Sequence, residues 1–195
     1  GPNGGGTGEE QGCNDGIDIY FGTFAKSFAL IGGFISSTKE IITFLRYNMR
    51  SQIFAKSLPM PLVIGLLKRL ELLNKHPEYR TKLWNIAMSL QKGLVDAGFN
   101  IGDTNTMVTP VYMNGSIPEA TNMVIDLREN FGIFCSMVVY PVIPKGMIIL
   151  RLIPTAVHTQ EDVKYTIESF SQIKDKLYGG KYAADKIRAG FSQAL

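Results

Sequence analysis

The sequence is poor in the residues that mark disulfide-stapled, zinc-binding or membrane-spanning proteins. Its 195 residues include two cysteines, Cys13 and Cys135, with no CxxC pair and no histidine nearby. This argues against a disulfide framework and a zinc site, so we expect no bound metal and a reducing, cytoplasmic setting. We find no signal peptide, and no apolar run reaches the roughly 18–20 residues that a membrane-spanning helix needs. Membrane contact is therefore expected to be peripheral at most.

The chain also lacks a strong charge of either sign. Its 20 basic and 17 acidic residues give a net charge of +3, and the basic residues are scattered rather than clustered. Such a weak, dispersed charge argues against nucleic acid as a partner. A content of 45% hydrophobic and 19% charged residues is typical of a globular protein that buries a core.

The first part of the chain predicts a short sheet followed by helices. The expected elements are a Gly-rich loop over 1–16, strands over 17–24 and 32–37, a helix over 38–49, an irregular stretch over 50–61 and a helix over 61–76. Ser37 and Glu40 have the spacing of a capping box at the start of the first helix. Pro59 and Pro61 are expected to block a helix in the irregular stretch.

The second part predicts a small α+β unit. The expected elements are a helix over 77–98, a strand over 106–113, a helix over 117–132, strands over 133–141 and 147–155, and a last helix to about residue 177. Thr159 and Asp162 have the spacing of a capping box for that last helix. Residues 100–180 thus give the order β-α-β-β-α.

One lysine, Lys26, lies in the apolar and small-residue stretch FGTFAKSFALIGGF. Taken alone, a lysine at a strand end extends its ammonium group to solvent. Here Thr23 and Ser27 supply hydroxyl groups on either side, and the neighbouring glycines and alanines allow close approach to the backbone. A lysine that is desolvated by such surroundings has a lowered pKa and can form a Schiff base as an amine nucleophile.

The stretch TFAKSFALIG, residues 23–32, resembles the pyridoxal-phosphate attachment signature of class II aminotransferase-like enzymes. Within that superfamily the chain is similar to the α-oxoamine synthases, in its loop GPNGGGTGEEQG and in PVIPKGMIILRLIPTAVHT near its end. The resemblance implies an α/β fold of the type I pyridoxal-phosphate transferases. Residues 1–75 would end the large cofactor-binding domain, 76–180 would form a small α+β domain, and 181–195 would be a tail. The chain would be the C-terminal part of a longer enzyme, since the family's cofactor aspartate and stacking histidine have no counterpart here.

The resemblance also implies roles for individual residues. Lys26 would bear the cofactor and move the α-proton of the substrate, and the hydroxyl of Thr23 would help hold the cofactor phosphate. Arg151 would grip the amino-acid carboxylate, a role that suits the bidentate guanidinium fork. In the family a serine reaches across the dimer interface to the partner's cofactor phosphate. Ala55 stands at that position here, and Ser57, two residues further on, would be the candidate for this contact.

Two other residues are assigned no catalytic role. His158 is expected to order the turn between the last strand and the last helix. Cys135, on an apolar strand, is expected to be inert core.

The implied reaction is a decarboxylative condensation of an amino acid with an acyl-coenzyme A, in a homodimer whose active sites lie at the interface. The stretches 98–115 and 126–146 look most like bacterial serine palmitoyltransferases, which make 3-oxosphinganine for sphingolipids. The alternatives are 8-amino-7-oxononanoate synthase and glycine C-acetyltransferase, in which an arginine often stands where this chain has Ile149. A catalytically silent scaffold subunit of the same fold is a further alternative, against which Lys26 argues.

Overall fold

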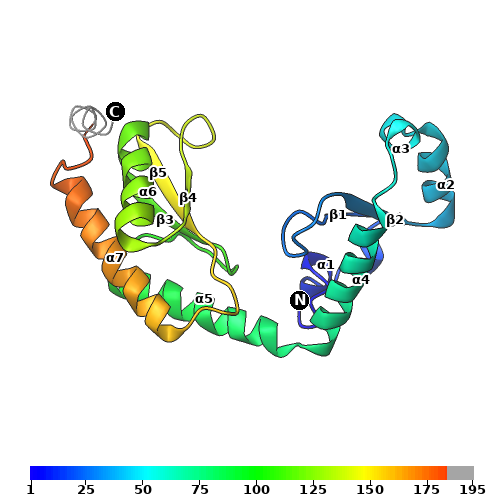
Figure 1. Cartoon of the computed structure of the whole chain (residues 1–195), viewed down its shortest axis with the longest axis horizontal. Coiled ribbons are helices and arrows are strands. Elements are labelled where there is room, and N and C mark those ends of the chain that lie inside the picture. Colours follow the sequence, from blue (N-terminus) through cyan, green and yellow to red (C-terminus); the bar gives the residue numbers. More distant parts are fainter. Residues whose placement is uncertain (184–195) are drawn as a thin grey trace. The chain divides into compact units, whose positions relative to one another are not determined.

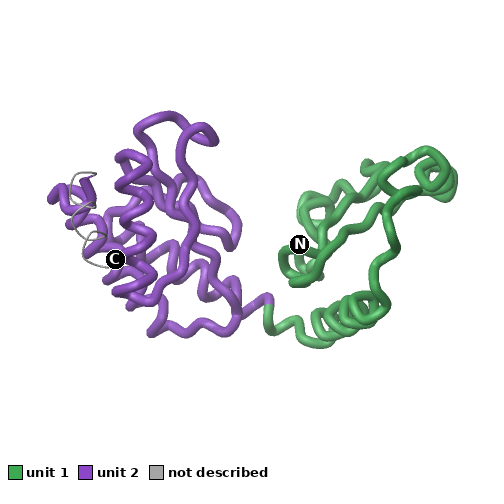
Figure 2. The backbone as a smooth tube through the Cα atoms, turned by 45° about the horizontal axis from the view of Figure 1, so that its top comes forward, with its two compact units in different colours: residues 1–79 green, residues 80–195 purple. Residues whose placement is uncertain are grey.

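The computed structural model describes residues 1–183. By its internal contacts the chain divides into two compact units, unit 1 over residues 1–79 and unit 2 from residue 80 onward (Figure 2). The division falls between Tyr79 and Arg80, close to the boundary expected after residue 75. Among the described residues, no helix has both the length and the apolar character needed to cross a membrane.

Unit 1 contains a two-stranded antiparallel sheet and several helices (Figure 1). Its elements are α1 (Thr7–Glu10), a 3-10 turn (Asn14–Gly16), β1 (Ile19–Thr23), β2 (Gly33–Ser37), α2 (Lys39–Asn48), α3 (Arg50–Phe54) and α4 (Met60–Lys75). Thr23 pairs with Gly33 in the register of β1 and β2. A Cβ atom on Gly33 would lie 2.6 Å from the carbonyl oxygen of Gly22, so a glycine is required where the two strands approach.

Three local predictions in unit 1 are wrong for identifiable reasons. Ser37 does not cap α2, because its Oγ donates a hydrogen bond to the carbonyl of Asp18 at 2.5 Å, and the N-cap residue is Thr38, whose side chain makes no capping bond. The stretch expected to be irregular contains the short helix α3. Pro61 does not block a helix but lies in the first turn of α4, where a missing N–H group costs no intrahelical bond.

Unit 2 has the predicted order β-α-β-β-α, preceded by a long helix (Figure 1). Its elements are α5 (Glu78–Asp96, whose first two residues belong to unit 1), β3 (Thr109–Asn114), α6 (Ile117–Phe131), β4 (Ser136–Val138), β5 (Met147–Leu152) and α7 (Gln160–Tyr178). The sheet has the strand order β3-β5-β4, and both pairs are antiparallel. Strand β4 occupies only the middle of the strand expected over 133–141.

Both helices that follow a turn in unit 2 are closed at their N-termini by capping boxes. In α7 the Thr159 side chain accepts the N–H of Asp162 and the Asp162 carboxylate accepts the N–H of Thr159, as the sequence predicts. That backbone hydrogen bond from Thr159 lowers the pKa of Asp162. Ser116 and Glu119 form the same arrangement at the start of α6.

The core of unit 2 is one continuous cluster, because alternate residues of its strands point toward the three helices. Its largest fully buried side chains are Phe170, Leu94, Met123, Leu127, Ile148, Leu150, Ile173 and Val111. On β5 the burial alternates, so Ile148, Leu150 and Leu152 are buried while Arg151 is exposed on the opposite face. The alternation therefore places Arg151 on the face of the sheet that is turned away from the core.

The predicted tail over 181–195 begins with residues that pack onto unit 2. Tyr182 is buried and its hydroxyl donates a hydrogen bond to the carboxylate of Asp126, which also accepts from Lys176 Nζ at 2.6 Å. Burial opposes ionisation of Asp126, but the hydrogen bonds from Lys176, Tyr182 and Asn130 outweigh it and lower the pKa of this carboxyl group. The remainder of the predicted tail, residues 184–195, lies outside the described residues.

Candidate active site

The loop between β1 and β2 carries Lys26 and is folded by its own backbone. The N–H of Ala29 donates to the carbonyl of Lys26 at 2.9 Å, which closes a tight turn. The N–H of Phe24 donates to the carbonyl of Gly32 at 2.9 Å and closes the loop as a whole. Ala29 has φ +48° and Gly32 has φ +94°, so the loop passes twice through the left-handed region that L-residues avoid. The backbone around Lys26 is thus a defined, partly strained structure.

An aromatic cluster anchors this loop. Phe24 is buried, and its ring stacks on that of Phe34, with centroids 5.6 Å apart, while Phe28 meets it edge-on at 5.9 Å. Phe24 and Phe28 stand on either side of Lys26 in the sequence. Because aromatic pairs of this geometry add to the gain from burial alone, they hold both ends of the lysine turn in place. The sequence analysis did not identify this role, although three of the four phenylalanines within FGTFAKSFALIGGF form the cluster and could have suggested it.

Thr23 ends strand β1, and Lys26 lies in the loop that follows it. Thr23 Oγ1 accepts the N–H of Ala25 at 3.2 Å and donates to the carbonyl of Gly32 at 3.3 Å, so the hydroxyl is tied across the loop that bears the lysine. Lys26 itself is exposed, and none of the described residues forms an ion pair or hydrogen bond with its Nζ atom. The desolvation that the sequence suggested is not supplied by unit 1. The amine is instead accessible, beside a hydroxyl group and a backbone with little side-chain bulk.

The Gly-rich loop at the start of unit 1 is organised by one acidic residue. The carboxylate of Glu9 accepts the N–H of Gly5 at 2.7 Å, the N–H of Asn3 at 3.1 Å and Asn3 Nδ2 at 2.6 Å. The bond from Gly5 is the largest cause of the lowered pKa of Glu9. Glu9 therefore fixes the path of a loop whose glycines would otherwise leave it unrestrained. Sequence reasoning missed this residue.

Ser57 lies in the exposed segment between α3 and α4. Its neighbour Leu58 packs against the Lys26 loop, since a Cβ atom added to Gly32 would meet Leu58 Cδ2 at 2.8 Å. The segment that bears Ser57 therefore approaches the end of the loop within unit 1. A phosphate contact by Ser57 stays a prediction.

Arg151 belongs to unit 2, where β5 is the central strand of the sheet. Its Nε atom donates a hydrogen bond to Ser136 Oγ at 3.0 Å, from the directly opposite position on β4. No acidic side chain among the described residues pairs with this guanidinium, which leaves its charge available for an anion from outside unit 2. Arg151 is thus held by a neutral hydroxyl group and not by a structural ion pair within the described residues.

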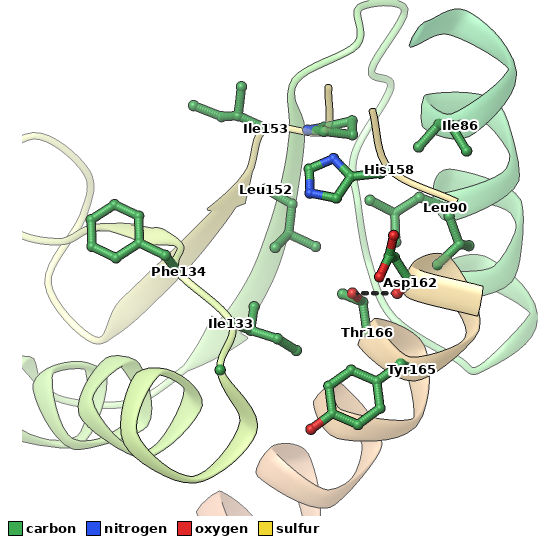
Figure 3. Close-up of a pocket in the computed structure, with 13 residues that line it drawn as sticks. Ile86, Leu90, Ile133, Phe134, Leu152, Ile153, His158, Asp162, Tyr165 and Thr166 are labelled. Carbon is green, nitrogen blue, oxygen red and sulfur yellow. Dashed lines mark hydrogen bonds between the residues drawn. The ribbon is translucent and has the colours of Figure 1, made fainter. Parts of the chain in front are cut away.

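Unit 2 also contains a hollow of about 380 Å³ between α5, the chain after α6, the end of β5 and the start of α7 (Figure 3). Apolar side chains dominate its walls, with Ile86, Leu152 and Phe134 among them, and His158 and Asp162 lie at its centre in the view. The His158 Nδ1 atom accepts the N–H of Thr155 at 2.9 Å. This bond orders the turn before α7 and confirms the structural role expected for His158. No residue to which the sequence analysis gave a catalytic or cofactor role lines this hollow.

The sequence of the chain matches that of known protein families over most of its length. Residues 4–170 match the family "Aminotransferase class I and II". The chain is 59% identical to the cysteate-C-fatty acyltransferase of Capnocytophaga ochracea. The match covers 94% of this chain and 44% of that protein. It is 30% identical to a serine palmitoyltransferase of Sphingobacterium spiritivorum, in a match that covers 89% of this chain and 43% of that protein. An 8-amino-7-oxononanoate synthase of Petrotoga mobilis is 31% identical, in a match that covers 91% of this chain and 44% of that protein.

Solved structures match the fold as well. The serine palmitoyltransferase of Sphingomonas wittichii superposes with a TM-score of 0.80 at 30% identity, over 89% of this chain and 43% of that one. A structure of SPT (serine palmitoyltransferase) with PLP internal aldimine gives a TM-score of 0.80 at 32% identity, over 89% of this chain and 44% of that one. The chain thus spans less than half the length of the relatives that it matches.

Proposed function

The chain belongs to the aminotransferase class I and II family, and from this premise we propose that it forms part of a pyridoxal-phosphate-dependent acyltransferase of the α-oxoamine synthase type. Such an enzyme condenses an amino acid with an acyl-coenzyme A and releases carbon dioxide. The observation that carries the proposal is the loop of residues 24–32, in which an accessible lysine, Lys26, follows the anchored hydroxyl of Thr23. A silent scaffold subunit would have no need of that amine.

The residues of unit 1 fit the cofactor that the family uses. The carbonyl oxygen of Gly22 faces Gly33 so closely that any side chain there would clash, which keeps the strands beside the lysine free of bulk. Bound pyridoxal phosphate supplies an electron sink that stabilises negative charge at the α-carbon of an amino acid. Lys26 would hold the cofactor through Nζ, and the same amine would move the proton at the α-carbon of the substrate. The hydroxyl groups of Thr23 and, by prediction, Ser57 would help hold the phosphate, and Thr23 Oγ1 would release its hydrogen bond to the carbonyl of Gly32 in order to donate there.

Arg151 holds the α-carboxylate of the amino acid. Its guanidinium offers paired N–H donors that match the two carboxylate oxygens, and no acid among the described residues competes for them. A carboxylate held in this way is fixed relative to the α-carbon, so that the α-proton can face the base. The arginine binds and orients the substrate and takes no part in the proton transfer.

For the amino acid we propose cysteate as the first candidate and serine as the second. Sequence likeness alone favoured serine and a palmitoyl thioester. The 59% identity to a cysteate-C-fatty acyltransferase, against 30% to a serine palmitoyltransferase, supports an amino acid that carries a sulfonate in place of the hydroxyl group. Both relatives act on fatty acyl groups by name, so a long acyl chain is common to the two candidates.

The proposal extends to the assembly and the compartment. We propose a homodimer whose active sites lie at the interface, as the family resemblance implies. Both cysteines are unpaired thiols, with Cys13 exposed and Cys135 buried, which supports a reducing compartment such as the cytoplasm. Burial raises the pKa of Cys135 to about 11, so this thiol is an inert core residue rather than a nucleophile.

The test of the reaction is a product assay with the full-length protein that carries this chain. The enzyme is loaded with pyridoxal phosphate and given L-cysteate, L-serine, glycine or L-alanine, each with acetyl-, pimeloyl- or palmitoyl-coenzyme A. We expect release of coenzyme A and a product mass equal to the amino acid plus the acyl group, minus carbon dioxide and the one hydrogen that leaves on the coenzyme A thiol. L-cysteate and palmitoyl-coenzyme A should be the best pair. No product from any pair would overturn the proposal, and a product from pimeloyl-coenzyme A with L-alanine would redirect it to 8-amino-7-oxononanoate synthesis.

A further inference from the structure

We propose that Ser136 is a positioning residue for the amino-acid carboxylate and acts through Arg151. The inference rests on the proposed function, because it assumes that Arg151 binds that carboxylate. Sequence reasoning gave Ser136 no role. Three features of unit 2 support such a role: the register of the sheet, the geometry of the hydrogen bond, and the absence of another partner for Arg151 among residues 80–183.

The register leaves Ser136 as the one cross-strand neighbour that can orient Arg151. As a residue of the central strand, Arg151 has a partner on each side, Pro110 on β3 and Ser136 on β4. Directly opposite residues on antiparallel strands point to the same face of the sheet. A proline ring has no polar group to offer, whereas the serine hydroxyl can accept an N–H. The next row of the same face, Tyr112, Ile149 and Val138, contains no charged group.

The hydrogen bond to Ser136 uses the Nε atom of Arg151, which is not needed to bind a carboxylate through the two terminal nitrogens. Arg151 donates from Nε to Ser136 Oγ at 3.0 Å, which leaves the terminal nitrogens, Nη1 and Nη2, for a ligand. Because the guanidinium is planar, fixing Nε also fixes the direction of this terminal pair. A carboxylate that approaches along that direction accepts two parallel hydrogen bonds.

Without this restraint the arginine would have to be ordered by the substrate. An arginine side chain loses rotamer entropy when it is immobilised, and this loss opposes binding. Ser136 supplies part of that order before the substrate arrives, so its loss is expected to weaken amino-acid binding more than it slows the chemical step. A serine that only stabilised the edge strand β4 would affect thermal stability and leave substrate binding unchanged.

The experiment is a double-mutant cycle in the full-length enzyme, with L-cysteate and L-serine as amino acids. The variants are Ser136→Ala, Ser136→Thr, Arg151→Ala and the double variant Ser136→Ala with Arg151→Ala. The matched control is Ser89→Ala, which removes a side-chain hydrogen bond of similar kind, from Ser89 Oγ to Gln160 Oε1 at 2.7 Å, elsewhere in unit 2. KM and kcat are measured, together with the dissociation constant of the amino acid from an absorbance titration without acyl-coenzyme A, and the melting temperature.

For Ser136→Ala we expect KM and the dissociation constant of the amino acid to rise about tenfold, with kcat within about twofold of the native value. Ser136→Thr keeps the hydroxyl and suits a strand, so both constants should return to within about twofold. In the Arg151→Ala background, Ser136→Ala should add nothing, because the group that it orients is gone. Ser89→Ala should leave substrate binding unchanged.

Two results would overturn the inference alone, and a third would overturn it together with the carboxylate clamp of the proposed function. If Arg151→Ala weakens amino-acid binding but Ser136→Ala does not, the arginine is the clamp and the serine does not position it. If Ser136→Ala weakens binding equally with and without Arg151, the serine acts by another route. If Arg151→Ala leaves amino-acid binding intact, the carboxylate clamp of the proposed function fails and the role of Ser136 fails with it.

Discussion

Units 1 and 2 differ in how many of their large apolar side chains they bury. Unit 2 buries a continuous cluster drawn from α5, α6, α7, β3 and β5, with residues such as Phe170 and Leu127 fully enclosed. In unit 1, which lies wholly within the described residues, Phe24 is the one large apolar side chain that is buried. Its large exposed apolar residues include Phe21, Ile31, Phe44, Tyr47, Phe54, Met60, Ile64 and Leu67.

The unit that carries Lys26 is therefore not the unit that contains the hydrophobic core. Met60, Ile64 and Leu67 recur at the spacing of one face of helix α4, and each is more than 60% exposed, so an apolar stripe of that helix lacks a covering surface within unit 1. An exposed apolar area of this kind marks a surface that is covered in the functional protein. We infer that unit 1, with Lys26, depends on further protein for its stability, whereas unit 2, with Arg151, holds its part of the site by itself. The greater length of the relatives leaves room for that further protein.

The largest effect on folding should follow from expressing the two units separately. Residues 80–183 expressed alone should unfold in one cooperative urea transition, because they contain a complete core. Residues 1–79 expressed alone should show no cooperative transition and should bind a hydrophobic dye. Circular dichroism and dye fluorescence check both. A sharp, cooperative transition for residues 1–79 would break the comparison.

A pair of methionines sharpens the comparison inside unit 2. Met123 on α6 is fully buried, and Met88 on α5 is 61% exposed. Met123→Ala should lower the free energy of unfolding by about 2–5 kcal/mol, through lost burial and the cavity that remains. Met88→Ala should change it by no more than about 0.5 kcal/mol. Urea denaturation of residues 80–183 measures both, and equal effects would mean that the core has been wrongly located.

A smaller effect on the free energy of unfolding should come from removing the hydrogen bonds of Asp126, which link Tyr182 to α6. Asp126 accepts hydrogen bonds from Lys176, Tyr182 and Asn130, and Asp126→Asn should cost about 1–3 kcal/mol. Because folding lowers the pKa of Asp126, its stabilising contribution is present above the unfolded value of about 3.9 and is lost as the pH falls through the folded value.

The variant should therefore show a smaller loss of stability between pH 7 and pH 3 than the native chain does. Asp96→Asn is the matched control, since Asp96 pairs with Lys92 on the exposed surface of α5 and such pairs contribute little. If Asp126→Asn and Asp96→Asn gave the same pH profile, the buried contact would have no special weight.

The parts of the fold that short stretches of sequence determine were predictable. The capping box of Thr159 and Asp162 needs only local spacing, and the structure contains it as predicted. Ser37 has the same local spacing but bonds to Asp18 across the sheet, so a tertiary contact replaced the cap. A pattern of residues cannot show which of two available partners a hydroxyl group will take.

The candidate site shows the same limit. Lys26 and Thr23 could be identified because both belong to one short motif, and the structure places them in one loop. Ser136 could not be identified, since its relation to Arg151 depends on the register between β4 and β5, which no local signal specifies. Exposure of the Lys26 side chain was also beyond the sequence, because desolvation depends on which surfaces surround a loop.

The most direct test of the account is to locate the bond between the chain and the cofactor. The full-length protein, incubated with pyridoxal phosphate, is reduced with borohydride, digested and analysed by mass spectrometry, and Lys26→Ala and Lys56→Ala are treated in parallel. We predict a pyridoxyl adduct on Lys26, a yellow absorbance before reduction, the loss of both in Lys26→Ala, and their retention in Lys56→Ala. An adduct on another lysine, or a native protein that takes up no cofactor, would contradict the central claim.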